Sequence, residues 1–178
     1  FNHESPIRGE NFVTRKITRA VAKRFLGDED VLYLGNLEAR RDWGHARDFV
    51  DGIWRIVQHP EPGDWVLATG KTHTVRELVE IAFSTVEIDI AWNGSGLEET
   101  GVDSNTGQVV VAISENYFRP NEVDLLCGDA TEAENVLGWK AKTTFADMIA
   151  EMVEEDIRVA RRARSVEQRK TLFPNGID

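Results

Sequence analysis

The sequence has little of what marks several classes of protein. It contains one cysteine, Cys127, so no internal disulfide can form, which agrees with a reducing cytoplasm. No apolar run approaches the roughly 20 residues that a membrane helix needs, and no signal-peptide pattern is present. The 31 acidic and 21 basic side chains give a formal net charge of −10, which disfavours non-specific attraction to nucleic acid or anionic lipid. We expect neither a membrane nor a nucleic-acid partner.

Patterns that would support catalysis within the chain are missing too. No Gly-x-Gly-x-x-Gly turn follows a strand, so we expect no dinucleotide phosphate cradle. Neither Tyr33 nor Tyr117 is followed by a lysine four residues later, and no Gly-x-Ser-x-Gly elbow is present. The four histidines show no metal-ligand spacing. We therefore predict no catalytic residue and no metal site in these residues.

What is present indicates part of a larger globular protein. Of the 178 residues, 41% are hydrophobic and 29% are charged, as in soluble globular domains. The chain begins with Phe1, and the stretch 1–6 has the pattern of a strand end that continues an earlier segment. We interpret the chain as a piece of a longer protein.

Hydrophobic periodicity predicts alternating helices and strands, hence an α/β fold that contains part of a sheet. The predicted helices cover residues 11–26, 44–58, a segment from Thr74, 129–137 and 144–164. The predicted strands cover residues 31–34, 65–68, 88–92 and 109–113, and residues 93–107 are expected to form a long surface loop. In the second helix, the side chains expected to be buried are Phe49, Val50, Ile53, Trp54 and Val57. Thr74 and Glu77 have the spacing of a capping box, and Cys127, among apolar neighbours, is expected to be packed.

Three segments carry groups suited to binding a phosphorylated ligand. In residues 2–10, Asn2 can donate an amide hydrogen to a phosphate and Arg8 can bind it in a bidentate fork. The alternative is a turn that caps the next helix. In residues 34–45, Arg41 precedes an expected helix start, which also favours an anion, while Asp42 can fix Arg41, cap the helix, or do both. A purely structural pair is the alternative.

The third segment is Tyr117-Phe-Arg-Pro-Asn-Glu, in which a proline stiffens the turn between Arg119 and Glu122. An arginine for phosphate and a carboxylate for ribose hydroxyls would clamp a nucleotide diphosphate, whereas a surface ion pair is the alternative. Before it, Arg15 and its helical neighbours at i+4 and i+8 are expected to form a solvated basic face. Lys16 projects about 100° away from Arg15 and can point elsewhere, for example at a base carbonyl.

Taken in order, these motifs resemble the GDP-mannose 4,6-dehydratases, which are extended short-chain dehydrogenases/reductases. The resemblance rests on Phe-Asn-His-Glu-Ser-Pro at 1–6, Phe-Val-Thr-Arg-Lys-Ile at 12–17, Arg-Asp-Trp-Gly-His-Ala at 41–46, Tyr-Phe-Arg-Pro-x-Glu at 117–122 and Leu-Gly-Trp-Lys at 137–140. It implies that the chain is a substrate-binding portion (1–178) interleaved with the last pieces of an NAD(P)-binding Rossmann sheet, about 1–6 and 44–70. The amino-terminal dinucleotide-binding portion has no counterpart here.

The resemblance also assigns roles to residues that match family positions. His3 and Arg8 match residues that contact NADP, and Asn2 matches one that holds the diphosphate of the sugar nucleotide. Lys16 matches the residue that reads guanine. Arg41 and Arg119 would neutralise the diphosphate, and Glu122 would accept hydrogen bonds from the ribose.

The family reaction is an internal redox dehydration of GDP-mannose to GDP-4-dehydro-6-deoxy-mannose, a precursor of fucose or rhamnose-type sugars. Hydride leaves C4 of the mannose and returns to C6, and water is lost between these steps. A homo-oligomer, dimer or tetramer, is implied, with the Arg8 loop near a neighbouring subunit's cofactor. The family's second arginine is replaced here by Ile7, which weakens that contact. A related nucleotide-sugar epimerase or reductase, or a non-catalytic binding module, remains the alternative.

Overall fold

The computed structural model describes residues 1–117 and 125–172, with side chains described as far as residue 166. The helices are, in chain order, α1 (Val13–Phe25), α2 (Ala46–Gln58), α3 (Val75–Ser84), the 3-10 turns η1 (Gly96–Glu98) and η2 (Glu115–Tyr117), α4 (Thr131–Leu137) and α5 (Phe145–Leu172). The strands are β1 (Asn2–Glu4), β2 (Leu32–Leu34), β3 (Arg40–Arg41), β4 (Trp43–His45), β5 (His73–Thr74), β6 (Ile90–Asn93), β7 (Thr100–Asp103), β8 (Val109–Ile113) and β9 (Leu125–Leu126).

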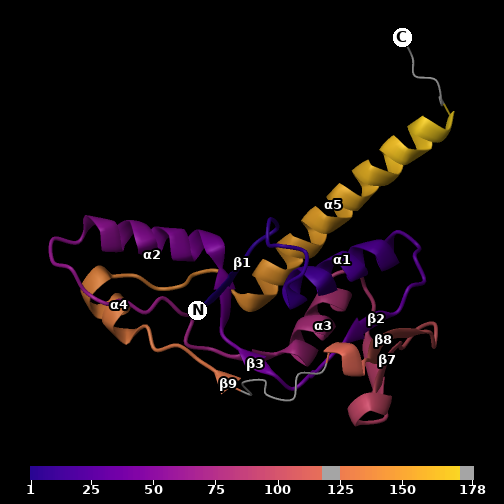
Figure 1. Ribbon diagram of the computed structural model, residues 1–178, viewed down its shortest axis with the longest axis horizontal. Coiled ribbons are helices and arrows are strands. Elements are labelled where there is room, and N and C mark those ends of the chain that lie inside the picture. Colours follow the sequence, from indigo (N-terminus) through magenta and orange to yellow (C-terminus); the bar gives the residue numbers. More distant parts are fainter. Residues whose placement is uncertain (118–124, 173–178) are drawn as a thin grey trace.

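The elements form two groups joined by short strands (Figure 1). One end holds α2 and α4, and the other holds α1, α3 and the larger sheet, with α5 extending outward beyond them. The larger sheet has the order β2-β8-β7-β6, in which β2 pairs with β8 in parallel and the other pairs are antiparallel. A parallel pair β1-β4 and a small sheet β5-β3-β9 lie between the groups. Within the described ranges, no helix combines the length and apolar character needed to cross a bilayer.

The main core lies where α1, α3 and α5 pack together beside the larger sheet. Ile17 and Val21 of α1 and Leu78 of α3 are fully buried there, because their helical spacing places them on one apolar stripe. The predicted capping box starts α3: the Glu77 amide donates to Thr74 Oγ1 at 3.0 Å, and the Thr74 amide donates to Glu77 Oε2 at 3.1 Å. This local prediction is confirmed.

A second, smaller core lies under α2 and α4. Trp139 is almost completely buried, contacts Phe49 edge-on, and donates from Nε1 to the Asp48 carbonyl at 2.7 Å. Gly52 permits the close approach of α2, since a Cβ there would lie 2.9 Å from Trp139 Nε1. The Leu-Gly-Trp-Lys motif is therefore a packing device: Gly138, in the left-handed conformation, ends α4 and turns Trp139 inward.

The structure corrects the prediction for the buried side of α2. Only Phe49 of the five predicted side chains is buried. Val50, Ile53, Trp54 and Val57 are 52–69% exposed. Hydrophobic periodicity identified the apolar side of this helix but not what covers it. In the described residues, the second core contacts α2 through Asp48, Phe49 and Gly52, and the other apolar side chains of the helix face outward.

Four further expectations are wrong in part. Residues 65–68 form no strand, although Leu67 and Ala68 are buried. The predicted loop 93–107 contains η1 and β7, because β6 and β8 supply ladder partners on both sides of Thr100–Asp103. Cys127 is exposed rather than packed. Arg15 is buried and ion-paired rather than solvated.

Candidate functional site

A cavity of about 550 Å³ gathers most of the predicted ligand-binding residues. Its wall includes Asn2 from β1, Arg8 from the following loop, Lys16 from α1 and Arg41 from β3. The volume falls within the range of about 300–1,000 Å³ that is usual for small-molecule sites. Arg119 and Glu122 lie outside the described residues. The site thus brings together an amide and three cationic side chains on a chain of net charge −10.

The alternation of β1 explains why His3 is not part of this cavity wall. Successive side chains of a strand point to opposite faces, so Asn2 and Glu4 face the cavity while His3 faces away. His3 stacks on Phe49 with ring centroids 5.2 Å apart. Its Nδ1 lies 3.1 Å from the Phe1 carbonyl, which can only accept, so Nδ1 carries the hydrogen. Of the two cofactor residues predicted from the resemblance, Arg8 therefore lies at the cavity, and His3 lies on the face of β1 that points away from it.

Arg8 is held at the cavity by neighbours that the sequence did not single out. Its Nε lies 3.1 Å from Glu4 Oε2, an ion-pair contact without hydrogen-bond alignment, and its guanidinium stacks 3.5 Å above the Phe12 ring. Glu4 is buried and accepts a 2.6 Å hydrogen bond from Thr14 Oγ1. The loop does not act as a side-chain cap, because α1 begins without one. The alternative that this loop only caps the helix is therefore wrong.

Burial raises the pKa of the Glu4 carboxyl above its ordinary value, although the Thr14 hydroxyl and Arg8 act in the opposite direction. An acid whose pKa is raised on folding stabilises the fold fully below its unfolded pKa, about 4.3, and loses that contribution as pH rises through the folded pKa. We expect Glu4→Gln, which cannot titrate, to gain stability relative to the native protein between about pH 4 and pH 7. Urea unfolding of both proteins at the two pH values measures this. A difference that shrinks as pH rises would contradict it.

Lys16 stands at the wall between two cavities. Its Nζ donates to the Tyr33 carbonyl at 2.6 Å and lies 3.3 Å from the centroid of the Tyr117 ring. It also lines a second, smaller cavity of about 330 Å³. Lys16 therefore points away from Arg15, as its helical position predicts. Tyr117 is a cavity residue that spacing alone did not assign, and its only signal was its place at the head of the third motif.

Asp42 is completely buried beside Arg41 and joins three segments of the chain. Its Oδ1 accepts from the Thr69 amide at 2.9 Å and from the Thr69 hydroxyl at 2.7 Å. Its Oδ2 accepts from the amides of Gly70 at 3.0 Å and Gly128 at 3.2 Å. The cap of α2 is instead His45, whose Nδ1 accepts from the Arg47 amide at 3.0 Å. The prediction that Asp42 caps this helix is thus wrong.

Arg41 reaches the cavity from β3, and its Nη1 donates to the Arg40 carbonyl at 2.8 Å. Among the residues that the structure describes, no group of three histidine, cysteine or acidic side chains is placed to hold a metal ion. The cavity wall offers the cationic side chains of Arg8, Lys16 and Arg41 for binding an anion, together with the Glu4 carboxylate.

Comparison with known proteins identifies the family. The model of the GDP-mannose 4,6 dehydratase family matches residues 1–152. The chain belongs to this family. A GDP-mannose 4,6-dehydratase from Sinorhizobium fredii (strain HH103) is 58% identical over 164 residues, which cover 92% of this chain and 47% of the relative. The human GDP-mannose 4,6 dehydratase is 49% identical over 161 residues, covering 90% of this chain and 43% of the relative. The chain thus spans less than half the length of these dehydratases.

Solved structures agree on the fold. A Pseudomonas aeruginosa protein, RMD, in complex with NADPH superposes with a TM-score of 0.73 at 19% identity, covering 89% of this chain and 47% of that one. A dTDP-glucose 4,6-dehydratase from Bacillus anthracis in complex with NAD has a TM-score of 0.65 at 15% identity and covers 86% and 41%. The predicted α/β class is confirmed.

Proposed function

We propose that this chain is the carboxyl-terminal, substrate-binding portion of an NADP-dependent GDP-mannose 4,6-dehydratase. The observation that carries the proposal is the meeting of Asn2, Arg8, Lys16 and Arg41 in one cavity. A diphosphate needs several convergent cations and amide donors, and arginine binds phosphate oxygens in a bidentate fork. The relatives named above act as dehydratases of GDP-mannose according to their names, and they are 58% and 49% identical to this chain.

Under this proposal each residue has a binding role. Arg41 neutralises the diphosphate with Asn2 beside it, and Lys16 reads the guanine carbonyl from the wall that it shares with Tyr117. Arg119 and Glu122 are proposed to complete the diphosphate and ribose contacts. These contacts orient the sugar, and fixing reactants in one geometry is worth several kcal/mol of the barrier.

NADP, when bound, would supply the hydride-transfer chemistry of the reaction. The groups present suit such a ligand: Arg8 offers a guanidinium at the cavity wall for phosphate, and His3 offers an imidazole on the other face of β1. We propose that His3 and Arg8 contact the cofactor from these two sides.

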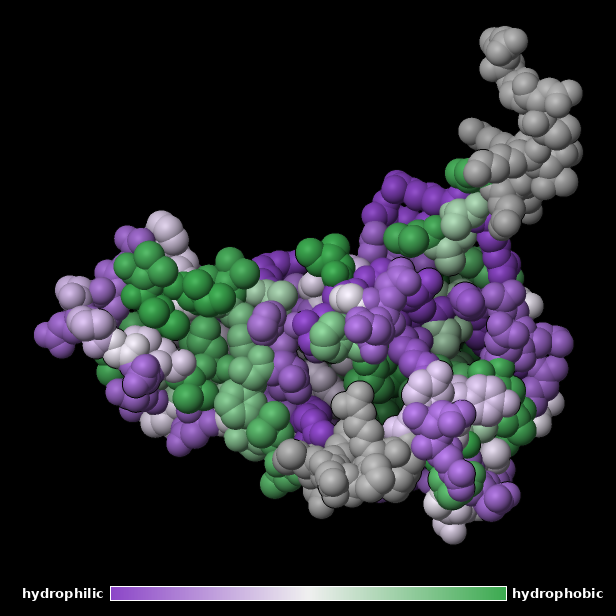
Figure 2. Space-filling view, viewed as in Figure 1, coloured by the Kyte–Doolittle hydropathy of each residue, from purple (hydrophilic) through white to green (hydrophobic). Residues whose placement is uncertain are grey.

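We further propose that a dinucleotide-binding portion, outside this chain, packs on α2. More than half of each relative's length lies beyond the matched span. Hydrophobic side chains gather over α2 on the surface (Figure 2), where Val50, Ile53, Trp54 and Val57 are at least half exposed. An apolar helix face of this kind is typical of an interface rather than of free surface. Residues 1–6 and 44–70 would then belong to the combined Rossmann sheet. This chain joined to that portion is called the intact enzyme below.

The intact enzyme is proposed to be a cytoplasmic homo-oligomer, with the Arg8 loop close to a neighbouring subunit's cofactor. Ile7, 91% exposed in this loop, stands where the family has a second arginine, so Arg8 alone would make the charged contact there.

Removal of the Arg41 guanidinium tests the proposed function. We expect Arg41→Ala in the intact enzyme to weaken GDP binding by more than about tenfold, because a hydrogen bond to a charged group contributes about 1.5–3 kcal/mol. Isothermal titration calorimetry with GDP gives the dissociation constant. The matched control is Arg47→Ala, which removes an arginine on α2 that pairs with Glu151 outside the cavity and should leave GDP affinity unchanged. Equal affinity in Arg41→Ala and the native enzyme would refute the assignment.

A further inference from the structure

A buried ion pair joins the start of α1 to the middle of α5. Arg15 Nε donates to both carboxylate oxygens of Asp156, at 2.9 and 3.0 Å, and its Nη2 lies 2.8 Å from Asp156 Oδ1. Thr18, one turn along α1, donates from Oγ1 to Asp156 Oδ2 at 2.7 Å. Asp156 is 3% exposed and Arg15 is 8% exposed, so both charges are removed from water. Their positions in the chain are 141 residues apart.

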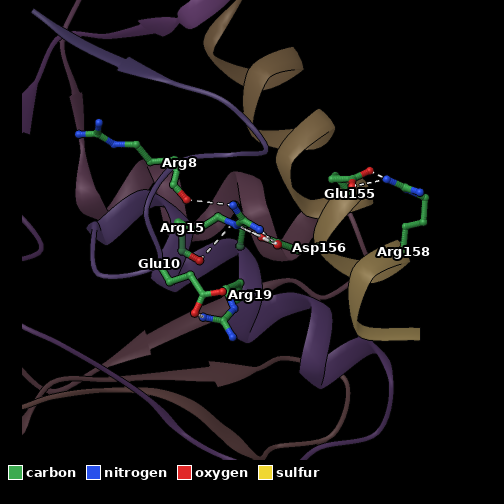
Figure 3. Close-up of polar contacts among 8 residues, drawn as sticks. Arg8, Glu10, Arg15, Arg19, Glu155, Asp156 and Arg158 are labelled. Atoms are coloured by element: carbon green, nitrogen blue, oxygen red, sulfur yellow. Dashed lines mark hydrogen bonds and ion pairs between the residues drawn. The ribbon is translucent and has the colours of Figure 1, made fainter. Parts of the chain in front are cut away.

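The pair does more than join two helices, because Arg15 uses its remaining nitrogen on the cavity loop. Arg15 Nη1 donates to the Arg8 carbonyl at 2.9 Å. Figure 3 shows that carbonyl turned toward Arg15, while the Arg8 guanidinium points in the other direction. Asp156 thus fixes the orientation of the Arg15 guanidinium, and the guanidinium in turn holds the backbone carbonyl of Arg8.

Arg8 is consequently gripped at two points from the first turn of α1. Thr14 holds Glu4, whose carboxylate pairs with the Arg8 side chain, and the next residue, Arg15, holds the Arg8 backbone. A buried ion pair is weak grounds for stability, since the cost of desolvating both charges offsets much of their attraction. The role of the Arg15–Asp156 pair is better explained as support for a ligand-binding side chain, because a small displacement of a binding group weakens its contacts.

We propose that Arg15 and Asp156 are positioning residues that hold Arg8 in its binding geometry at the cavity, so that α5 supports the site without touching a ligand. This inference rests on the proposed function, in which Arg8 binds NADP. Neither Arg15 nor Asp156 lines the described cavity. We expect their effect on binding to pass through Arg8, whose carbonyl Arg15 holds.

The test replaces the pair without leaving a buried charge. Arg15→Met with Asp156→Leu exchanges both for apolar side chains of similar size, a change that is often neutral for stability. In the intact enzyme we expect this double variant to raise the dissociation constant for NADP⁺ at least fivefold, as measured by calorimetry. Arg8→Ala should raise it about tenfold, the effect of one charge-assisted contact. The triple variant combines Arg8→Ala with Arg15→Met and Asp156→Leu. It should bind NADP⁺ no more weakly than Arg8→Ala alone, because we expect the pair to act only through Arg8.

Two further variants separate positioning from general stability. Asp156→Asn keeps the size of the side chain and one acceptor oxygen, so we expect it to give an intermediate loss of NADP⁺ affinity. This variant also tests the proposal in case the double variant does not fold. Val153→Ala removes a fully buried α5 side chain in the main core, and should lower the unfolding temperature without changing NADP⁺ affinity.

The outcomes distinguish failure of the positioning role of Arg15 and Asp156 from failure of the proposal that Arg8 binds NADP. Native NADP⁺ affinity in both the double variant and Asp156→Asn, with weakened binding in Arg8→Ala, would overturn the positioning role alone. Losses that add in the triple variant would overturn it as well. Unchanged affinity in Arg8→Ala would overturn both the cofactor role of Arg8 and the inference that depends on it.

Discussion

Replacing Asp42 with alanine is expected to lower the midpoint of thermal unfolding by about 6–12 °C. The carboxylate accepts four hydrogen bonds, from the Thr69 amide and hydroxyl and from the amides of Gly70 and Gly128. Its removal leaves these donors without their acceptor, and the Gly128 amide is buried. A loss of about 3 kcal/mol is a low estimate for such a group, and about 2–4 °C per kcal/mol applies to a chain of this size.

Circular dichroism during heating measures the effect, with two comparisons. Asp42→Asn keeps the shape but offers one acceptor oxygen, so it should cost roughly half as much. Asp51→Ala removes an acidic residue whose ion pair with Arg55 is partly exposed, and should shift the midpoint by less than about 2 °C. Since Asp42 adjoins Arg41 and anchors the segments at Thr69 and Gly128, we expect the Asp42→Ala variant to bind GDP more weakly as well. An Asp42→Ala protein as stable as the native one would show that these bonds are replaced by water.

Trp139→Ala is expected to destabilise the fold by about 3–5 kcal/mol, because it empties the centre of the second core. Trp139 is 1% exposed, packs edge-on against Phe49, and satisfies the Asp48 carbonyl at 2.7 Å. This core has few large side chains, so little can move in to fill the space. Chemical denaturation followed by far-ultraviolet circular dichroism gives the free energy of unfolding.

A conservative variant divides this loss into packing and hydrogen bonding. Trp139→Phe retains an aromatic ring but removes the indole N–H and some of the packed volume, so we expect it to cost about 1–3 kcal/mol, less than the alanine variant. Equal losses in Trp139→Phe and Trp139→Ala would mean that the hydrogen bond, rather than the packed ring, holds α2 and α4 together.

Local signals in the sequence predicted local structure well. The Thr74–Glu77 spacing predicted the start of α3, and Gly138 marked the end of α4, because a cap depends on residues within one turn. The strand Thr100–Asp103 was missed since Val102 is its only large apolar residue and Gly101 has low strand propensity. Pairing with β6 and β8 makes it a strand. The environment of α2 was missed for a similar reason: periodicity shows which face is apolar and not what covers it.

The candidate site divides in the same way. Asn2, Arg8, Lys16 and Arg41 were singled out as chemical groups and by resemblance, and the structure brings them into one cavity. The residues that hold them were not found. Arg15 looked like a solvated base because its partner, Asp156, lies on a helix at the far end of the chain. Nothing in a single sequence pairs residues at that distance.

The distance between these two residues also sets an order of events during synthesis. Chains grow at about 5–20 residues per second, so residue 156 follows residue 15 by several seconds or more. Until α5 has emerged and packed on α1, the buried guanidinium has no acid to neutralise it, and the loop that it anchors has no fixed backbone. The binding loop at the beginning of the chain is therefore among the last parts to mature. We expect chains released before α5 is made to have an unformed cavity.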